Sequence, residues 1–235
     1  MKNILARGGI EFVAVLLGIS GSLWVDDYRI ELINNEKTIY TLESLKKELE
    51  SADVYGQDVI QNIAEDVKAH NYIIDHWGKI NIDTLISLKL GRKGMTGETD
   101  LILALKAYRG FHPPRAIYNS LNNDGSIGLI DDLELKTKIN DVFQIRSKYL
   151  DEGSENQRYV YRRFNEYIIV NHPELQNKII EDRQKELAAF LIDKVVYGFI
   201  IEQRNLNEYI SQVIQWNLEA IDDLVVAIDN YLEKA

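Results

Sequence analysis

Apolar side chains recur every three or four residues along most of this chain, which is the spacing of one face of an α-helix. The first stretch with this spacing continues to about Trp77 without a proline. It predicts one very long helix, or two nearly collinear helices, with Gly56 as the favoured position for a bend. Apolar and polar residues nowhere alternate over a useful length, so no strand is predicted.

The same spacing predicts further helices in the rest of the chain, some short and some long. We expect them over 83–90, 99–109, from Pro113 to about 122, from about 131 to 170 with an interruption at Gly153, over 174–192 and over 195–232. The predicted fold class is all-α, in which an N-terminal transmembrane helix continues into a long-helix bundle with shorter inserted helices. We expect two domains, a transmembrane anchor over 1–29 and a helical bundle with a long stalk helix over 30–235.

The most apolar segment, GIEFVAVLLGISGSLWVDDYR over residues 9–29, has three interpretations: a secretory signal, a buried helix or a membrane span. Glu11 interrupts the apolar core that a secretory signal needs. Residues 8–25 would extend roughly 27 Å as a helix, which is short but workable for a span. Trp24 and Tyr28 then lie where an aromatic belt is expected, and Arg7 marks the other boundary. We therefore favour the membrane span.

One face of this segment combines small and ionisable residues. On a helix the stripe consists of Glu11, Ala14, Gly18, Ser22, Asp26 and Arg29. Small residues four positions apart let membrane helices approach closely, so the stripe predicts a helix–helix interface. Two interpretations of Glu11 stay open. It lies near the headgroups and pairs with Arg7, or it forms a ring of carboxylates inside an oligomer, as in cation-selective pores.

Composition narrows the classes of function. The 235-residue chain has a formal net charge of −10, which does not provide the basic surface that nucleic acid requires. It has no cysteine, so disulfides and thiolate metal sites are excluded. The four histidines form neither HxxxH nor HExxH, and no GxSxG motif is present, so we predict no metal site, no cofactor and no enzyme. An active site assembled from distant helices would leave no such signature.

Two segments carry a resemblance to a known family. The first is EFVAVLLGISGSLWVDDYR followed by LESLKKELE, and the second is AIYNSLNNDGSIGLIDDLELKTKI in mid-chain. They resemble a bacterial family of single-pass, membrane-anchored helical proteins of unknown function, whose short span of the form E-[I/F]-xx-V-xx-G precedes a long helix. The resemblance implies one anchor, a helical domain and no activity. It also singles out Glu11, because the glutamate of the span recurs in the family.

These observations favour a membrane-anchored, self-associating scaffold or interaction module, with the lipid bilayer, a second copy and another membrane protein as candidate partners. The first alternative is an oligomeric cation channel whose pore is lined by Glu11, Gly18, Ser22 and Asp26. A weaker alternative is an accessory single-span subunit of an ion-driven membrane complex. Basic residues and the amino terminus before the span predict a bacterial inner-membrane protein with a periplasmic helical domain.

Overall fold

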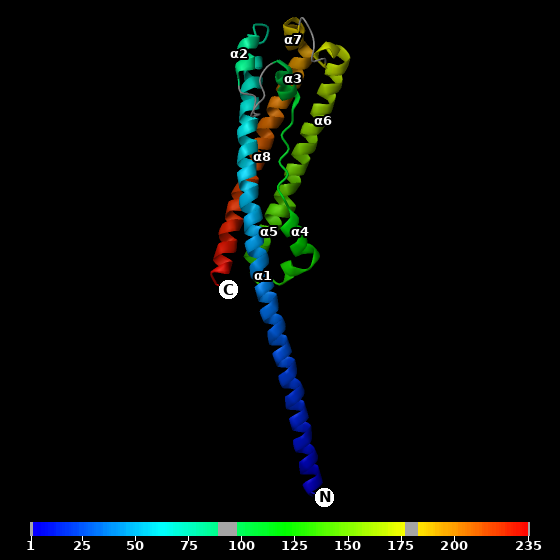
Figure 1. The fold of residues 1–235 in the computed structure, drawn as a ribbon, viewed down its shortest axis with the longest axis vertical. Helices are drawn as coiled ribbons and strands as arrows, with labels where there is room; N and C mark the ends of the chain where they lie inside the picture. Colours follow the sequence, from blue (N-terminus) through cyan, green and yellow to red (C-terminus); the bar gives the residue numbers. More distant parts are fainter. Residues whose placement is uncertain (1, 89–97, 177–182, 235) are drawn as a thin grey trace.

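The computed structural model describes residues 2–88, 98–176 and 183–234. In it, the long helix expected at the start of the chain is a single helix, α1 (Lys2–Asp75). The amino-terminal part of α1 projects alone beyond the rest of the molecule, and its second half lies within a helical bundle (Figure 1). α1 passes through Gly56 without a break, so the glycine serves close packing instead. A Cβ at this position would lie 2.7 Å from Cδ2 of Leu218 and 3.2 Å from the ring of Phe111.

The all-α fold class is confirmed over the described residues, which contain helices and no strand. The last helix, α8, runs antiparallel to α1 along the length of the bundle, and α6 packs beside α8 (Figure 1). The remaining helices are short and lie at the two ends. After α1 the helices are α2 (Ile82–Ser87), α3 (Glu98–Lys106), α4 (Ala116–Asn123), η1 (Ser126–Gly128), α5 (Leu133–Asn140), η2 (Asp141–Arg146), α6 (Ser147–Asn171), η3 (Pro173–Gln176), α7 (Arg183–Leu191) and α8 (Lys194–Leu232).

The helix predicted from about 131 to 170 is present as a continuous helical run with one irregular turn. Asp132 starts it as the N-cap, because its side chain accepts a hydrogen bond from the backbone N–H of Leu135. The six residues of η2 form a π-helical turn between α5 and α6. The interruption expected at Gly153 is wrong, since α6 continues through it. That glycine is buried against Ile210 of α8, and a side chain there would collide with the isoleucine.

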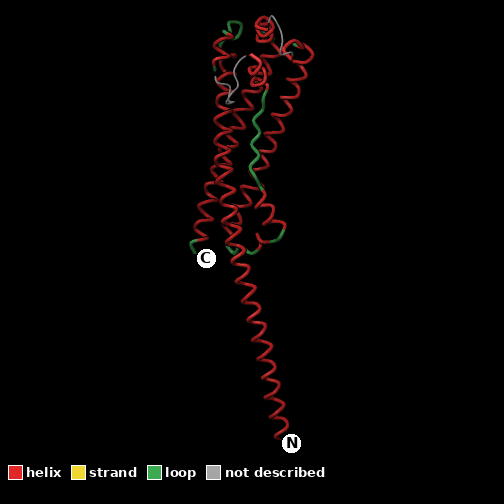
Figure 2. The backbone as a smooth tube through the Cα atoms, in the orientation of Figure 1, coloured by secondary structure: helices red, strands yellow, loops and turns green. Residues whose placement is uncertain are grey.

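The bundle contains two apolar cores, one above the other. The core nearer the projecting part of α1 includes Leu42, Leu45 and Leu49 of α1 together with Ile221 and Leu224 of α8. The core at the far end is rich in aromatic side chains. Three of them stack there, Phe164 of α6, Phe190 of α7 and Phe199 of α8. An extended segment, residues 107–115, runs along the bundle between these two ends (Figure 2).

One carboxylate, that of Asp193, connects two helices at the far end of the bundle. Asp193 caps α8 by accepting a hydrogen bond from the backbone N–H of Val195 at 2.7 Å. Its other oxygen accepts hydrogen bonds from Tyr167 at 2.8 Å and from Nε2 of His172 at 2.9 Å. Burial opposes ionisation, but these hydrogen bonds hold the pKa of Asp193 below its ordinary value. The end of α6 is thereby joined to the start of α8.

Within the described residues, none of the helices combines the length and the apolar character that crossing a membrane requires. The transmembrane anchor expected over 1–29 gains no support from this part of the chain and stays a prediction.

Candidate functional site

The part of α1 that projects from the bundle, here called the stem (residues 2–33), leaves large apolar side chains uncovered. Phe12 and Leu17 are each 67% exposed and Trp24 is 70% exposed. Side chains of this size are ordinarily buried, and an isolated helix is only marginally stable in water. The described part of the stem therefore presents an apolar surface on an unpacked helix, and surfaces of this kind are typical of regions that interact with other molecules.

Several residues of the predicted stripe are exposed on the stem, namely Gly18, Ser22, Asp26 and Arg29. An added Cβ at Gly18 would meet nothing within 4 Å, so no other described segment of this chain approaches that face. The side chains of Arg7, Glu11 and Ala14 lie outside the described part of the structure. The described part of the stripe is therefore open to a partner, and the structure does not test the two interpretations of Glu11.

The two predicted interfacial aromatic residues are placed together. The rings of Trp24 and Tyr28 lie one turn apart on α1, with centroids 6.1 Å apart and planes inclined by 16°. Acidic residues follow at once, with Asp26 and Asp27 beside the pair and Glu31 one turn further on. The stem thus changes from apolar to acidic just before it enters the bundle.

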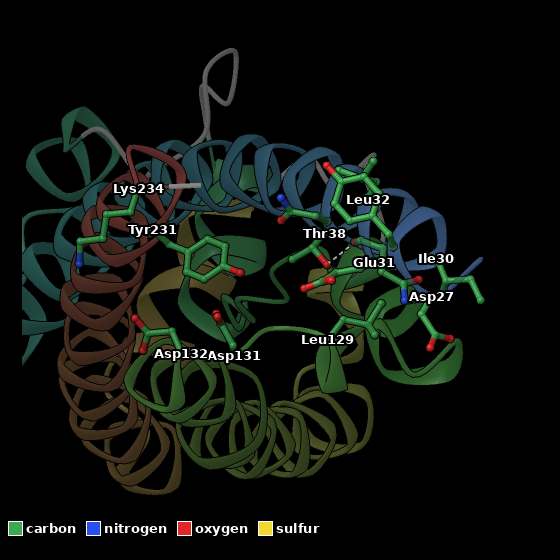
Figure 3. Close-up of a pocket in the computed structure, with 13 residues that line it drawn as sticks. Asp27, Ile30, Glu31, Leu32, Thr38, Leu129, Asp131, Asp132, Tyr231 and Lys234 are labelled. Atoms are coloured by element: carbon green, nitrogen blue, oxygen red, sulfur yellow. Dashed lines mark hydrogen bonds between the residues drawn. The ribbon is translucent and has the colours of Figure 1, made fainter. Parts of the chain in front are cut away.

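A recess of about 810 Å³ lies where α1 enters the bundle (Figure 3). Three segments that are distant in sequence form it: residues 27–38 of α1, the turn 129–132 before α5, and the end of α8. Figure 3 shows the phenol of Tyr231 and the carboxylates of Glu31 and Asp131 directed toward its middle. Thr38 is buried behind them and donates a hydrogen bond to the carbonyl of Asn34 at 2.8 Å.

The recess is negatively charged. It is lined by four carboxylates, those of Asp27, Glu31, Asp131 and Asp132, against a single ammonium group, that of Lys234. Burial and the neighbouring Asp131 and Asp132 raise the pKa of Tyr231. The recess also has apolar surface, because Leu129 and Leu32 are both exposed along it. This combination suits a group that carries both positive charge and apolar carbon.

Sequence reasoning did not find the recess. The sequence predicts a role for Tyr28 at a membrane interface, and it predicts no site for the residues of the other two segments. The adjacent acids in LIDDLEL gave a signal for a helix start, but nothing in the sequence places that turn beside Tyr231 or α1. The recess depends on tertiary packing.

A layer of buried polar side chains separates the two apolar cores. α1 contributes Asp66 and His70, and residues from α3, α6, α8 and the extended segment complete the layer. Asp66 binds Arg109 in a bidentate ion pair with N···O distances of 2.6 and 2.9 Å. Across the bundle, Gln157 donates a hydrogen bond to Asn207 at 2.8 Å. Buried polar pairs of this kind fix which residues face one another, because a slip would leave them unpaired.

His70 is fully buried in this layer. Its Nε2 lies 3.3 Å from the carbonyl of Leu105, and because a carbonyl only accepts, Nε2 carries the proton. Burial is the main reason that its pKa falls from 6.5 to about 4, and the positive charge of Arg204 adds to the effect while the bond to Leu105 opposes it. His70 is therefore neutral near pH 7.

No group of three or more His, Cys, Asp or Glu side chains in the described ranges is arranged to hold a metal ion. Comparison of the chain with models of protein families, with curated proteins and with solved structures finds no match. The resemblance to a bacterial family of membrane-anchored proteins is neither supported nor contradicted by these comparisons. The stem and the recess at its base are the features on which a functional proposal rests.

Proposed function

We propose that this chain is a membrane-anchored helical-bundle protein that acts as a scaffold or interaction module, with the stem as its anchor. The observation that carries the proposal is the uncovered apolar surface of the stem around Phe12, Leu17 and Trp24, with no other described segment within 4 Å of a Cβ added at Gly18 or Gly21. Immersion in lipid would cover the whole circumference of a lone helix at once. Each buried apolar side chain would contribute about 1.5–3 kcal/mol relative to leaving it in water.

The proposed anchor takes in GGIEFVAVLLGISGSLWV, residues 8–25, which has a single ionisable residue, Glu11. As a helix this segment extends roughly 27 Å, which is near the thickness of a bilayer core of about 30 Å. The stacked rings of Trp24 and Tyr28 would then lie at the level of the headgroups, where such residues are enriched. Asp26, Asp27 and Glu31 would follow in water.

Self-association is the second part of the proposal. Gly18 and Ser22 lie four residues apart on an exposed face, and small residues at this spacing allow two membrane helices to pack closely. We propose that copies associate in parallel through this face. The helical domain would then lie on one side of the membrane, for which the periplasm of a bacterium is the favoured side.

The anchor is tested by fractionation of bacteria that express the full chain. We expect the protein to sediment with membranes and to resist extraction by alkaline carbonate. Leu16→Lys combined with Ile19→Lys puts two charges into the stem and is expected to shift most of the protein to the soluble fraction. The control is Val170→Lys with Val226→Lys, which makes the same change at exposed apolar sites of the bundle. Wild-type protein in the soluble fraction would refute the anchor.

The oligomeric state of the protein in a mild detergent tests self-association. If the protein is a monomer, both the parallel packing and the cation-channel alternative are excluded. If a ring forms, ion flux into liposomes is compared between wild type and Glu11→Gln, and unchanged flux excludes a pore lined by this carboxylate. A reporter enzyme active only in the periplasm, fused after Ala235, determines the side of the domain.

A further inference from the structure

We infer that the recess at the base of the stem docks a basic, amphipathic segment of another membrane protein. This choice of partner rests on the proposed anchor, which places the recess at the membrane surface. The recess is formed by α1, the turn before α5 and the end of α8, so it belongs to the folded bundle and not to the stem alone.

The shape of the recess limits the size of the group that it receives. A volume of about 810 Å³ lies within the range of pockets that hold small molecules, roughly 300–1,000 Å³. It admits a few side chains from one helical turn or loop, and it does not admit a whole domain. Exposed Leu32 and Leu129 supply apolar contact for such side chains.

The charge of the recess selects a basic segment. Glu31 and Asp131 point toward its middle, and Asp27 lies at the rim (Figure 3). Lys234 alone offers the opposite charge. Lysine or arginine on the partner would meet an excess of carboxylates, and such complementarity sets specificity and the rate of association.

A lipid headgroup and a second copy of this chain fit less well. Membrane surfaces that carry anionic lipid attract basic protein segments, so an acidic recess would be repelled by them. Copies anchored in parallel present the same end at the same height, and an acidic recess beside an identical acidic recess is repelled too. A basic segment of another membrane protein that lies near the membrane surface is therefore the occupant that the charge of the recess and its proposed position favour.

The test uses the full chain in a non-ionic detergent and exploits its lack of cysteine, because Leu129→Cys then carries a single environment-sensitive dye inside the recess. The probes are two helical peptides of about 14 residues with the same pattern, one of leucine and lysine and the other of leucine and glutamate. We expect the dye to respond to the lysine peptide at a concentration at least tenfold lower than to the glutamate peptide. The response should weaken as salt rises.

Removal of three recess charges by Asp27→Asn, Glu31→Gln and Asp131→Asn is expected to weaken binding of the lysine peptide by about tenfold or more. The matched control removes three exposed charges elsewhere, by Glu152→Gln, Glu155→Gln and Asp223→Asn, and is expected to bind as the wild type does.

Equal responses to both peptides, or equal binding by the recess variant and the wild type, would overturn the inference. An equal response from a dye at Tyr159→Cys on α6 would overturn it as well, because binding would then not be local. A response to vesicles with a cationic lipid but not to the peptide would assign the recess to lipid instead. Because the assay runs in detergent, its result is independent of whether the stem spans a membrane.

Discussion

Acidification should destabilise the bundle through His70. This side chain is buried and neutral, with its pKa lowered from 6.5 to about 4, chiefly by loss of solvation. Above pH 6.5 neither the folded nor the unfolded chain protonates it. As the pH falls from 6.5 to about 4, the unfolded chain takes up a proton that the folded chain does not, so stability is lost across this window. Below about 4 both states are protonated, and this group contributes no further loss.

The expected size of the effect follows from the two pKa values. Between pH 7.5 and pH 4.5 the free energy of unfolding should fall by about 2.5 kcal/mol through His70 alone. Other groups also titrate in this window, so the quantity to measure is the difference between wild type and His70→Gln. Glutamine retains an N–H donor for the carbonyl of Leu105 and does not titrate.

Urea unfolding of the full chain in a non-ionic detergent, followed by circular dichroism at 222 nm, gives both free energies at each pH. His112→Asn is the control, because it replaces an exposed histidine. A wild-type minus His70→Gln difference that changes by less than about 1 kcal/mol between pH 7.5 and pH 4.5 would refute the reasoning.

Four further predictions concern stability, measured by the same unfolding assay. Gly198→Ala, on an open helical surface, should stabilise by about 0.5–1 kcal/mol, whereas Gly56→Leu, against α8, should destabilise by about 1–3 kcal/mol. Asp66→Asn leaves the partly buried guanidinium of Arg109 without its ion pair and should cost about 3 kcal/mol. Asp193→Ala removes a helix cap and two side-chain hydrogen bonds and should cost about 2–3 kcal/mol.

Each of these has an outcome that contradicts it. Stabilisation by Gly56→Leu would mean that α1 and α8 do not approach closely at that position. A cost below about 1 kcal/mol for Asp66→Asn would mean that water solvates the guanidinium. An Asp193→Ala variant within about 0.5 kcal/mol of the wild type would mean that the cap and the two side-chain hydrogen bonds do not stabilise the bundle.

The sequence predicts the positions of the long helices well, but it does not predict which residues of one helix pack against which residues of another. The spacing of apolar residues correctly indicated α1 and α8, because the buried face of a long amphipathic helix is visible in the sequence as apolar residues three or four positions apart. Gly56 and Gly153 were read as positions for a bend or a break, since glycine weakens a helix in isolation. Both are instead positions where α8 comes close, and a single sequence contains no information on which helix faces which.

The same limit applies to the candidate site. The stem was recognisable, because an apolar run that ends in Trp24, Asp26 and Asp27 is a local feature. The recess was not, because Glu31, Asp131 and Tyr231 belong to segments that only the fold brings together. Likewise, nothing in the spacing of Asp66 showed that its partner would be Arg109 in an extended segment.

The continuity of α1 has a mechanical consequence. Its 74 residues form a rod roughly 110 Å long, at about 1.5 Å per residue, with no proline or irregular turn to act as a joint. A push, tilt or twist applied to the free end is therefore delivered to the contact between α1 and α8. Packed helices move past one another in steps and not by gradual deformation, and the pairs formed by Asp66 and His70 lie along that path.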